Sequence, residues 1–162
     1  MEMALKEAEK AKDLGEVPIG AVLVKNGQVL ATGFNLREKQ QLVTAHAEML
    51  AIQQGNQKLQ SWRLTDTTLY VTMEPCVMCG GAIIQSRIAR VVFGAYDPKG
   101  GACGSVINLF EQKGFNHEVL VTGGVLEASC SKMLTDFFQE LRVRNRKRKA
   151  LKKLEQPEQQ EQ

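Results

Sequence analysis

Four side chains have the types and spacing of a catalytic metal centre: His46, Glu48, Cys76 and Cys79. One imidazole and two thiolates are ligands that zinc accepts, and three protein ligands leave a tetrahedral ion one position for water. Glu48 follows His46 by two residues, so we expect its carboxylate beside that water and not on the metal. There it would accept a proton from the water and deliver it to a substrate. The four residues together predict a zinc-dependent hydrolytic site.

The spacing of the two cysteines suits the start of a helix. Residues three apart share a helix face, so Cys76 and Cys79 can reach one metal ion. Pro75 is compatible with a first helical turn, and the positive helix N-terminus favours thiolates. His46 and Glu48 are two residues apart and would not share a face of a regular helix. We therefore expect them in an irregular first turn, or a glutamate that reaches around the metal.

Other interpretations use the same residues. A Cys-x-x-Cys pair also occurs as the redox pair of thioredoxin-like proteins. A closed four-cysteine site would need Cys103 and Cys130, which follow at intervals of 24 and 27 residues, wider than usual zinc clips. Those two thiols are more typical of small buried hydrophobic residues. His46 could also be a buried histidine without a metal. The joint pattern with Glu48 favours the catalytic centre.

Helical and β-rich segments alternate along the chain and must position these residues. Apolar spacing predicts helices over 3–14, 45–57, 76–86 and 126–154, and strands within 17–35, 67–74, 89–97 and 117–125. The first strand region holds Asn26-Gly27, a strong signal for a tight hairpin turn. Two strand–helix–strand crossovers imply parallel neighbours. The order predicts an α/β fold with a mixed five-stranded sheet and helices on both faces.

Length and composition indicate one domain, residues 1–154, followed by a disordered polar tail, residues 155–162. No apolar run approaches the roughly 18 residues that cross a bilayer, and the first residues lack a signal-peptide core. We expect a cytoplasmic protein with reduced cysteines and no membrane partner.

Positive charge is concentrated at the C-terminus. Residues 142–162 hold eight Lys or Arg and three Glu, a net charge of +5, whereas residues 1–141 hold thirteen basic and fifteen acidic residues, a net charge of −2. Such a block suits a polyanion such as nucleic acid, or is simply a solvated helix end.

The motif "HAE", followed about 30 residues later by "PCVMC", is the signature of zinc-dependent nucleobase deaminases. Further stretches resemble the bacterial tRNA-specific adenosine deaminase family and cover nearly all of residues 15–142: "GEVPIGAVLV", "TAHAEMLAI", "SWRL", "TLYVTMEPCVMCGGAI", "RVVFGAYDPKGG", "FNHEV" and "DFFQELR". The sequence after Arg144 is not distinctive of that family. The resemblance implies a three-layer α/β/α cytidine-deaminase-like fold and a homodimer.

The resemblance also implies a reaction, the hydrolytic deamination of the wobble adenosine of a tRNA anticodon to inosine. His46, Cys76 and Cys79 would hold one zinc ion per subunit, and Glu48 would be the proton shuttle. Asn35 would bond the target nucleotide, although a turn-forming Asn is the alternative. The remaining contacts with the anticodon stem-loop implied by resemblance are Asp97, Lys99, Asn116, His117, Phe137, Phe138 and Arg142. Because adjacent helical residues point about 100° apart, we expect one phenylalanine ring buried and the other at the substrate.

Two rival functions remain. A free nucleobase or nucleoside deaminase, of the guanine or cytosine deaminase type, would use the same zinc and glutamate chemistry. A zinc-stabilised RNA-binding module without catalysis is the second, but it would have no use for Glu48. Glu74 has no part in either scheme, and we expect a structural carboxylate at the end of a strand.

Overall fold

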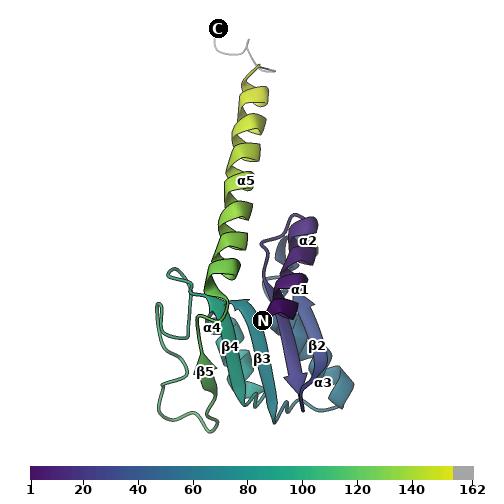
Figure 1. The fold of residues 1–162 in the computed structure, drawn as a ribbon, viewed down its shortest axis with the longest axis vertical. Coiled ribbons are helices and arrows are strands. Elements are labelled where there is room, and N and C mark those ends of the chain that lie inside the picture. Colours follow the sequence, from purple (N-terminus) through teal and green to yellow (C-terminus); the bar gives the residue numbers. More distant parts are fainter. Residues whose placement is uncertain (155–162) are drawn as a thin grey trace.

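A five-stranded sheet lies at the centre of the structure, a computed structural model that describes residues 1–154 (Figure 1). The predicted tail at residues 155–162 lies outside the described residues. Across the sheet the strands run in the order β2 (Gln28–Phe34), β1 (Gly20–Lys25), β3 (Thr67–Met73), β4 (Arg90–Ala95) and β5 (Leu120–Thr122). β1 is antiparallel to β2 and β3, whereas β4 is parallel to β3 and β5. The predicted mixed five-stranded sheet is confirmed.

The connections between strands explain this order. Asn26 and Gly27 both have positive φ, 51° and 74°, which confirms the tight hairpin between β1 and β2. Helix α4 (Val77–Gln85) joins the parallel neighbours β3 and β4, as predicted. The crossover through α3 (Ala47–Leu59) differs, because β1 lies between the two strands that it joins. β4 and β5 are parallel neighbours without a helix between them. The long loop that joins them must therefore run back to the end of the sheet at which β4 begins.

Helices cover both faces of the sheet. Helix α1 (Glu2–Asp13) approaches so closely that a Cβ on Gly20 would lie 2.1 Å from the Ala4 carbonyl oxygen. A Cβ on Gly33 would lie 2.3 Å from the Ala47 carbonyl oxygen of α3. Gly33 pairs with the residue after Gly20, so these glycines face opposite sides of the sheet. The α/β/α layering is therefore set by two close backbone contacts.

The other two long helices complete these layers. Helix α4 packs beside α3, and their shared core with the sheet contains Leu69, Ile83 and Phe93. Helix α5 (Glu127–Leu154) lies on the face covered by α1, and Lys12 Nζ of α1 lies 3.4 Å from Glu140 Oε1 of α5. The predicted loop before α3 contains a short helix, α2 (Arg37–Gln40). Within residues 1–154, every helix is too short or too polar to cross a membrane.

Candidate active site

Three predicted metal ligands meet where the N-termini of α3 and α4 converge, at the carboxyl end of β3. His46 is the N-cap of α3, Cys76 is the N-cap of α4, and Cys79 is the third residue of α4. His46 Nδ1 lies 3.8 Å from Cys76 Sγ and 3.6 Å from Cys79 Sγ. All three ligand atoms lie within 4.8 Å of one another. The fold thus brings residues 30 positions apart into one potential coordination sphere.

The geometry and chemistry of this group fit a zinc ion. Tetrahedral zinc with Zn–N near 2.0–2.1 Å and Zn–S near 2.3 Å requires ligand atoms about 3.6 Å apart, close to the observed separations. The neighbouring Cys79 and His46 lower the pKa of Cys76 to about 4 despite burial. The proximity of Cys76, together with burial, raises the pKa of Cys79. A second thiolate in this group therefore needs a cation between the sulfur atoms.

The helix starts explain how His46 and Glu48 can both face the site. His46 has an extended backbone, with φ −78° and ψ 153°, and α3 begins at Ala47. Glu48 is therefore the second helical residue and His46 lies outside the helix, in place of the irregular first turn in which we expected both. Cys76 is likewise extended, with φ −76° and ψ 175°. Pro75 precedes this N-cap, so it lies outside the first turn in which we expected it.

Glu48 has the properties of a proton carrier at neutral pH. Its side chain is buried, only 4% exposed. Burial raises the pKa of Glu48 to about 7, against the opposing effects of a backbone amide and of His46. A carboxyl group with a pKa near 7 can both accept and return a proton at neutral pH.

Asn35 is held at the same end of the sheet by a buried glutamate that sequence reasoning missed. Asn35 Nδ2 donates to Glu16 Oε2 over 3.3 Å, and the backbone amides of Glu38 and Lys39 also donate to Glu16, over 3.3 and 2.5 Å. Leu36 N donates to the carbonyl of Ala45, the residue before His46, over 3.0 Å. Glu16 therefore ties Asn35 and α2 together next to the metal ligands. In the sequence, the position of this acid between the turn residue Gly15 and the apolar residues 17–19 could have indicated that Glu16 is buried.

Glu74 organises the loop beside Cys76. Its carboxylate accepts hydrogen bonds from the backbone amides of Asp97, Cys103 and Ser105 over 2.9, 2.9 and 3.1 Å, and one from the Ser105 hydroxyl. Burial opposes ionisation, but these hydrogen bonds outweigh it and lower the pKa of Glu74. The same loop pairs Gly101 with Cys76. The prediction of a structural carboxylate at a strand end is confirmed.

Replacing Glu74 by glutamine should lower the free energy of unfolding at pH 7 by about 2–4 kcal/mol, because an amide cannot accept all of these bonds. A carboxylate with a lowered pKa stabilises the fold above its unfolded-state pKa and loses this effect as the pH falls through its folded-state pKa. The gap between the wild type and Glu74→Gln should therefore shrink in acid. Urea unfolding of both proteins at pH 7 and below pH 4 measures this difference in the free energy of unfolding.

Glu111→Gln is the control for this change, since Glu111 is an exposed carboxylate in the following loop. We expect its unfolding curves to match the wild type at both pH values. A Glu74→Gln protein with wild-type stability at pH 7 would contradict the structural role of Glu74.

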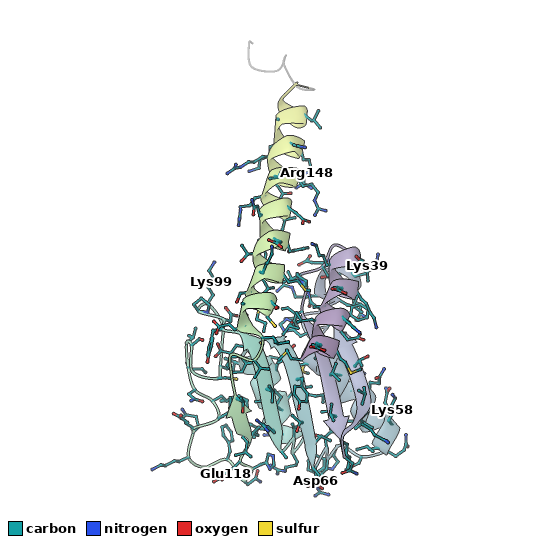
Figure 2. All side chains as sticks on the ribbon, viewed as in Figure 1. Lys39, Lys58, Asp66, Lys99, Glu118 and Arg148 are labelled. Carbon is teal, nitrogen blue, oxygen red and sulfur yellow. The ribbon has the colours of Figure 1, made fainter. Side chains whose placement is uncertain are left out.

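Several predicted RNA contacts lie at the metal end of the molecule. Asp97 and Lys99 follow β4, and Lys99 N donates to Asp97 Oδ1 over 3.0 Å. Figure 2 shows Lys99 near the base of α5, at the end of the sheet where α2 carries Lys39. On α5, Phe137 is buried and Phe138 is 40% exposed, so one ring is buried and one exposed as predicted. Arg142, one turn further along α5, is exposed.

Asn116 and His117 are not brought together with the metal ligands. Asn116 Oδ1 accepts from Arg87 Nη1 over 2.7 Å, and His117 Nε2 lies 2.8 Å from the Ile88 carbonyl oxygen. Arg87 and Ile88 precede β4, so this pair lies where the parallel strands begin. Figure 2 shows the adjacent Glu118 at the same end of the molecule as Asp66, opposite to Lys99. The reason is topological, because β5 is parallel to β4 and its leading loop must return to that end.

Comparisons with known proteins agree with this geometry. The family model described as MafB19-like deaminase matches residues 1–142. A tRNA-specific adenosine deaminase from Bacillus subtilis is 54% identical over 153 residues, covering 94% of this chain and 93% of the relative.

Two solved structures allow a comparison of fold. One, from a study of A-to-I editing by tRNA:A34 deaminases at the wobble position, has a TM-score of 0.80 and 45% identity, covering 83% of this chain and 97% of that one. A guanine deaminase from Bacillus subtilis has a TM-score of 0.58 and 29% identity, covering 88% of this chain and 90% of that one. The wobble-editing structure is therefore the more similar of the two.

Proposed function

Since the chain belongs to the MafB19-like deaminases and, among deaminases, to the tRNA-specific adenosine deaminases, we propose that it hydrolyses adenosine at the tRNA wobble position to inosine, releasing ammonia. The observation that carries this proposal is the buried Glu48 beside three converging metal ligands, in a chain 54% identical to a tRNA-specific adenosine deaminase.

Each residue of the site has one task in this reaction. Zinc held by His46, Cys76 and Cys79 would supply hydroxide at neutral pH, by lowering the pKa of its bound water toward about 7. Glu48 takes the proton of the attacking water. It gives that proton to the adenine ring nitrogen, then takes the proton of the hydroxyl now on C6 and passes it to the departing amino group, so that the C6 carbonyl forms and ammonia leaves. The buried position of Glu48 keeps this proton exchange away from bulk solvent.

The anticodon must deliver its wobble base to this site by rotating it out of the stack. Asn35, whose side chain is held by Glu16, is proposed to bond the target nucleotide. Asp97, Lys99, Phe138 and Arg142 are proposed to contact the flanking nucleotides, through charge and ring stacking. Membership of this group also supports a homodimer in the cytoplasm, where tRNA is modified.

Incubation with an unmodified anticodon stem-loop, free adenosine, guanine and cytosine tests the proposal. We expect inosine from the stem-loop and no product from the three small substrates, because only the RNA engages groups outside the base pocket. Nucleoside analysis by mass spectrometry measures the product. The control is a stem-loop with guanosine at the wobble position. Ammonia release from guanine or cytosine, with none from RNA, would support the free-base deaminase alternative.

A further inference from the structure

The second half of α5 extends beyond the rest of the molecule. Up to residue 151, Phe137 is the last buried side chain of the helix, and in the described residues Glu140 makes the ion pair between α5 and α1. From residue 142 to 151 the side chains are exposed, apart from a half-buried Asn145. Figure 1 shows this part of α5 projecting alone past α1 and the sheet. The family model ends at residue 142, so the projection lies beyond the part of the chain that this model matches.

This basic extension, residues 142–151, carries a high density of positive charge. Its ten residues span about 15 Å of helix. They include six cations and no acid: Arg142, Arg144, Arg146, Lys147, Arg148 and Lys149. No ion pair within residues 1–154 involves any of the six. Since successive residues turn by about 100°, the cations surround the helix instead of forming one stripe.

The charge pattern works against the helix on its own. Arg142 and Arg146 are four residues apart, as are Arg144 and Arg148. Like charges at this spacing repel each other and destabilise an isolated helix. The extension also lacks packing against other elements that would compensate. A polyanion that neutralises these charges would remove the repulsion, so the helix and such a ligand stabilise each other.

The extension projects from the end of the molecule that holds the site. Lys99 lies near the base of α5 in Figure 2, and Arg148 marks the projecting part. Residues 1–141 carry a net charge of −2, so the deaminase domain itself has no overall attraction for RNA. An RNA bound at that end of the molecule therefore meets the chain's excess positive charge on this helix.

We propose that the part of the basic extension beyond Arg142 binds backbone phosphates of the tRNA substrate outside the anticodon loop. This inference rests on the proposed function for the identity of the RNA. Cations around a helix with few other hydrogen-bonding groups suit backbone phosphates and do not read base sequence. Each phosphate that a cation neutralises releases counterions, so the contribution falls with salt. The extension thus adds affinity for the body of the substrate, while the pocket selects the base.

The test compares two charge-matched triple variants of the full chain. Arg144→Gln, Arg146→Gln and Arg148→Gln together remove three charges from the extension, and glutamine retains high helix propensity. Lys25→Gln, Lys58→Gln and Arg63→Gln together remove three charges elsewhere, two of them near the start of β3. Affinity for full-length tRNA is measured from 50 to 200 mM salt. Turnover is measured on full-length tRNA and on the anticodon stem-loop.

We expect the extension variant to bind full-length tRNA about tenfold more weakly at low salt, with a slope of log affinity against log salt smaller by about 2. Its turnover at saturating RNA and its activity on the stem-loop should match the wild type. The control variant should match the wild type throughout. Circular dichroism of the wild type should show a helical gain on adding tRNA that the extension variant lacks.

Two outcomes would overturn the proposal. An unchanged salt slope in the extension variant would identify the basic extension as a solvated helix end. An equal loss of tRNA affinity in both variants would show that any positive charge on the surface contributes equally. If the wild type binds tRNA with the expected slope but forms no inosine, the proposed function fails while the phosphate-binding extension stands.

Discussion

Replacing Glu48 by alanine is expected to lower inosine formation by about two to four orders of magnitude, the usual range for losing a general acid–base group. The chain should still bind about one zinc ion, because Glu48 is not among the three ligands that a tetrahedral catalytic site uses. Metal content by atomic emission and inosine yield from the same sample measure both effects. The pairing of lost activity with retained metal separates a proton carrier from a ligand.

Stability provides a further readout for this change. Glu48 is only 4% exposed, and burial disfavours its ionised form. Removing the carboxyl group relieves that cost, so the melting temperature of Glu48→Ala should be no lower than that of the wild type. Glu48→Gln is the matched control of similar volume, and it should be as inactive as the alanine variant. An active Glu48→Ala protein, or one that has lost its zinc, would refute the assigned role.

The candidate metal ligands could be predicted from the sequence because local chemistry indicates them. Cys76 and Cys79 lie within one turn, and His46 precedes Glu48 at another helix start, so each pair can be interpreted without knowing the fold. Asn26-Gly27 predicted its hairpin for the same reason, since its backbone angles depend on two residues alone. Only the meeting of the two helix N-termini depends on the fold, and the alternation of strands and helices in the sequence indicated that fold.

Long-range contacts could not be predicted in this way. Glu16 is charged and lies far from Asn35 in the sequence, so nothing local indicated that it is buried and bonded to that side chain. The positions of Asn116 and His117 depend on β5 being parallel to β4, which reverses the loop before it. The resemblance implied a role for these two residues, but it did not indicate at which end of the sheet they lie. The positions of these residues depend on tertiary contacts and strand pairing, and residue type alone does not indicate them.

Replacing Cys79 by alanine should remove both metal and activity. Cys79 is fully buried and its sulfur lies 3.6 Å from His46 Nδ1, so no solvent ligand can take its place without rearrangement. Because metal bound only to the folded state stabilises it, the loss should also lower the free energy of unfolding by about 4 kcal/mol at a thousandfold excess of zinc over its Kd. Thermal denaturation with added zinc, and again with a chelator, measures this difference.

The control is Cys103→Ala. Burial, with Glu74 and Glu48 nearby, raises the pKa of Cys103 to about 12, so it stays a neutral thiol, and it lies outside the group of potential ligands. Its backbone amide, which bonds Glu74, is unaffected by the substitution. Cys103→Ala should therefore keep its zinc and respond to the chelator as the wild type does, whereas Cys79→Ala should not respond. If the chelator destabilises Cys79→Ala as much as the wild type, the metal is held elsewhere, and the ligand set of His46, Cys76 and Cys79 is wrong.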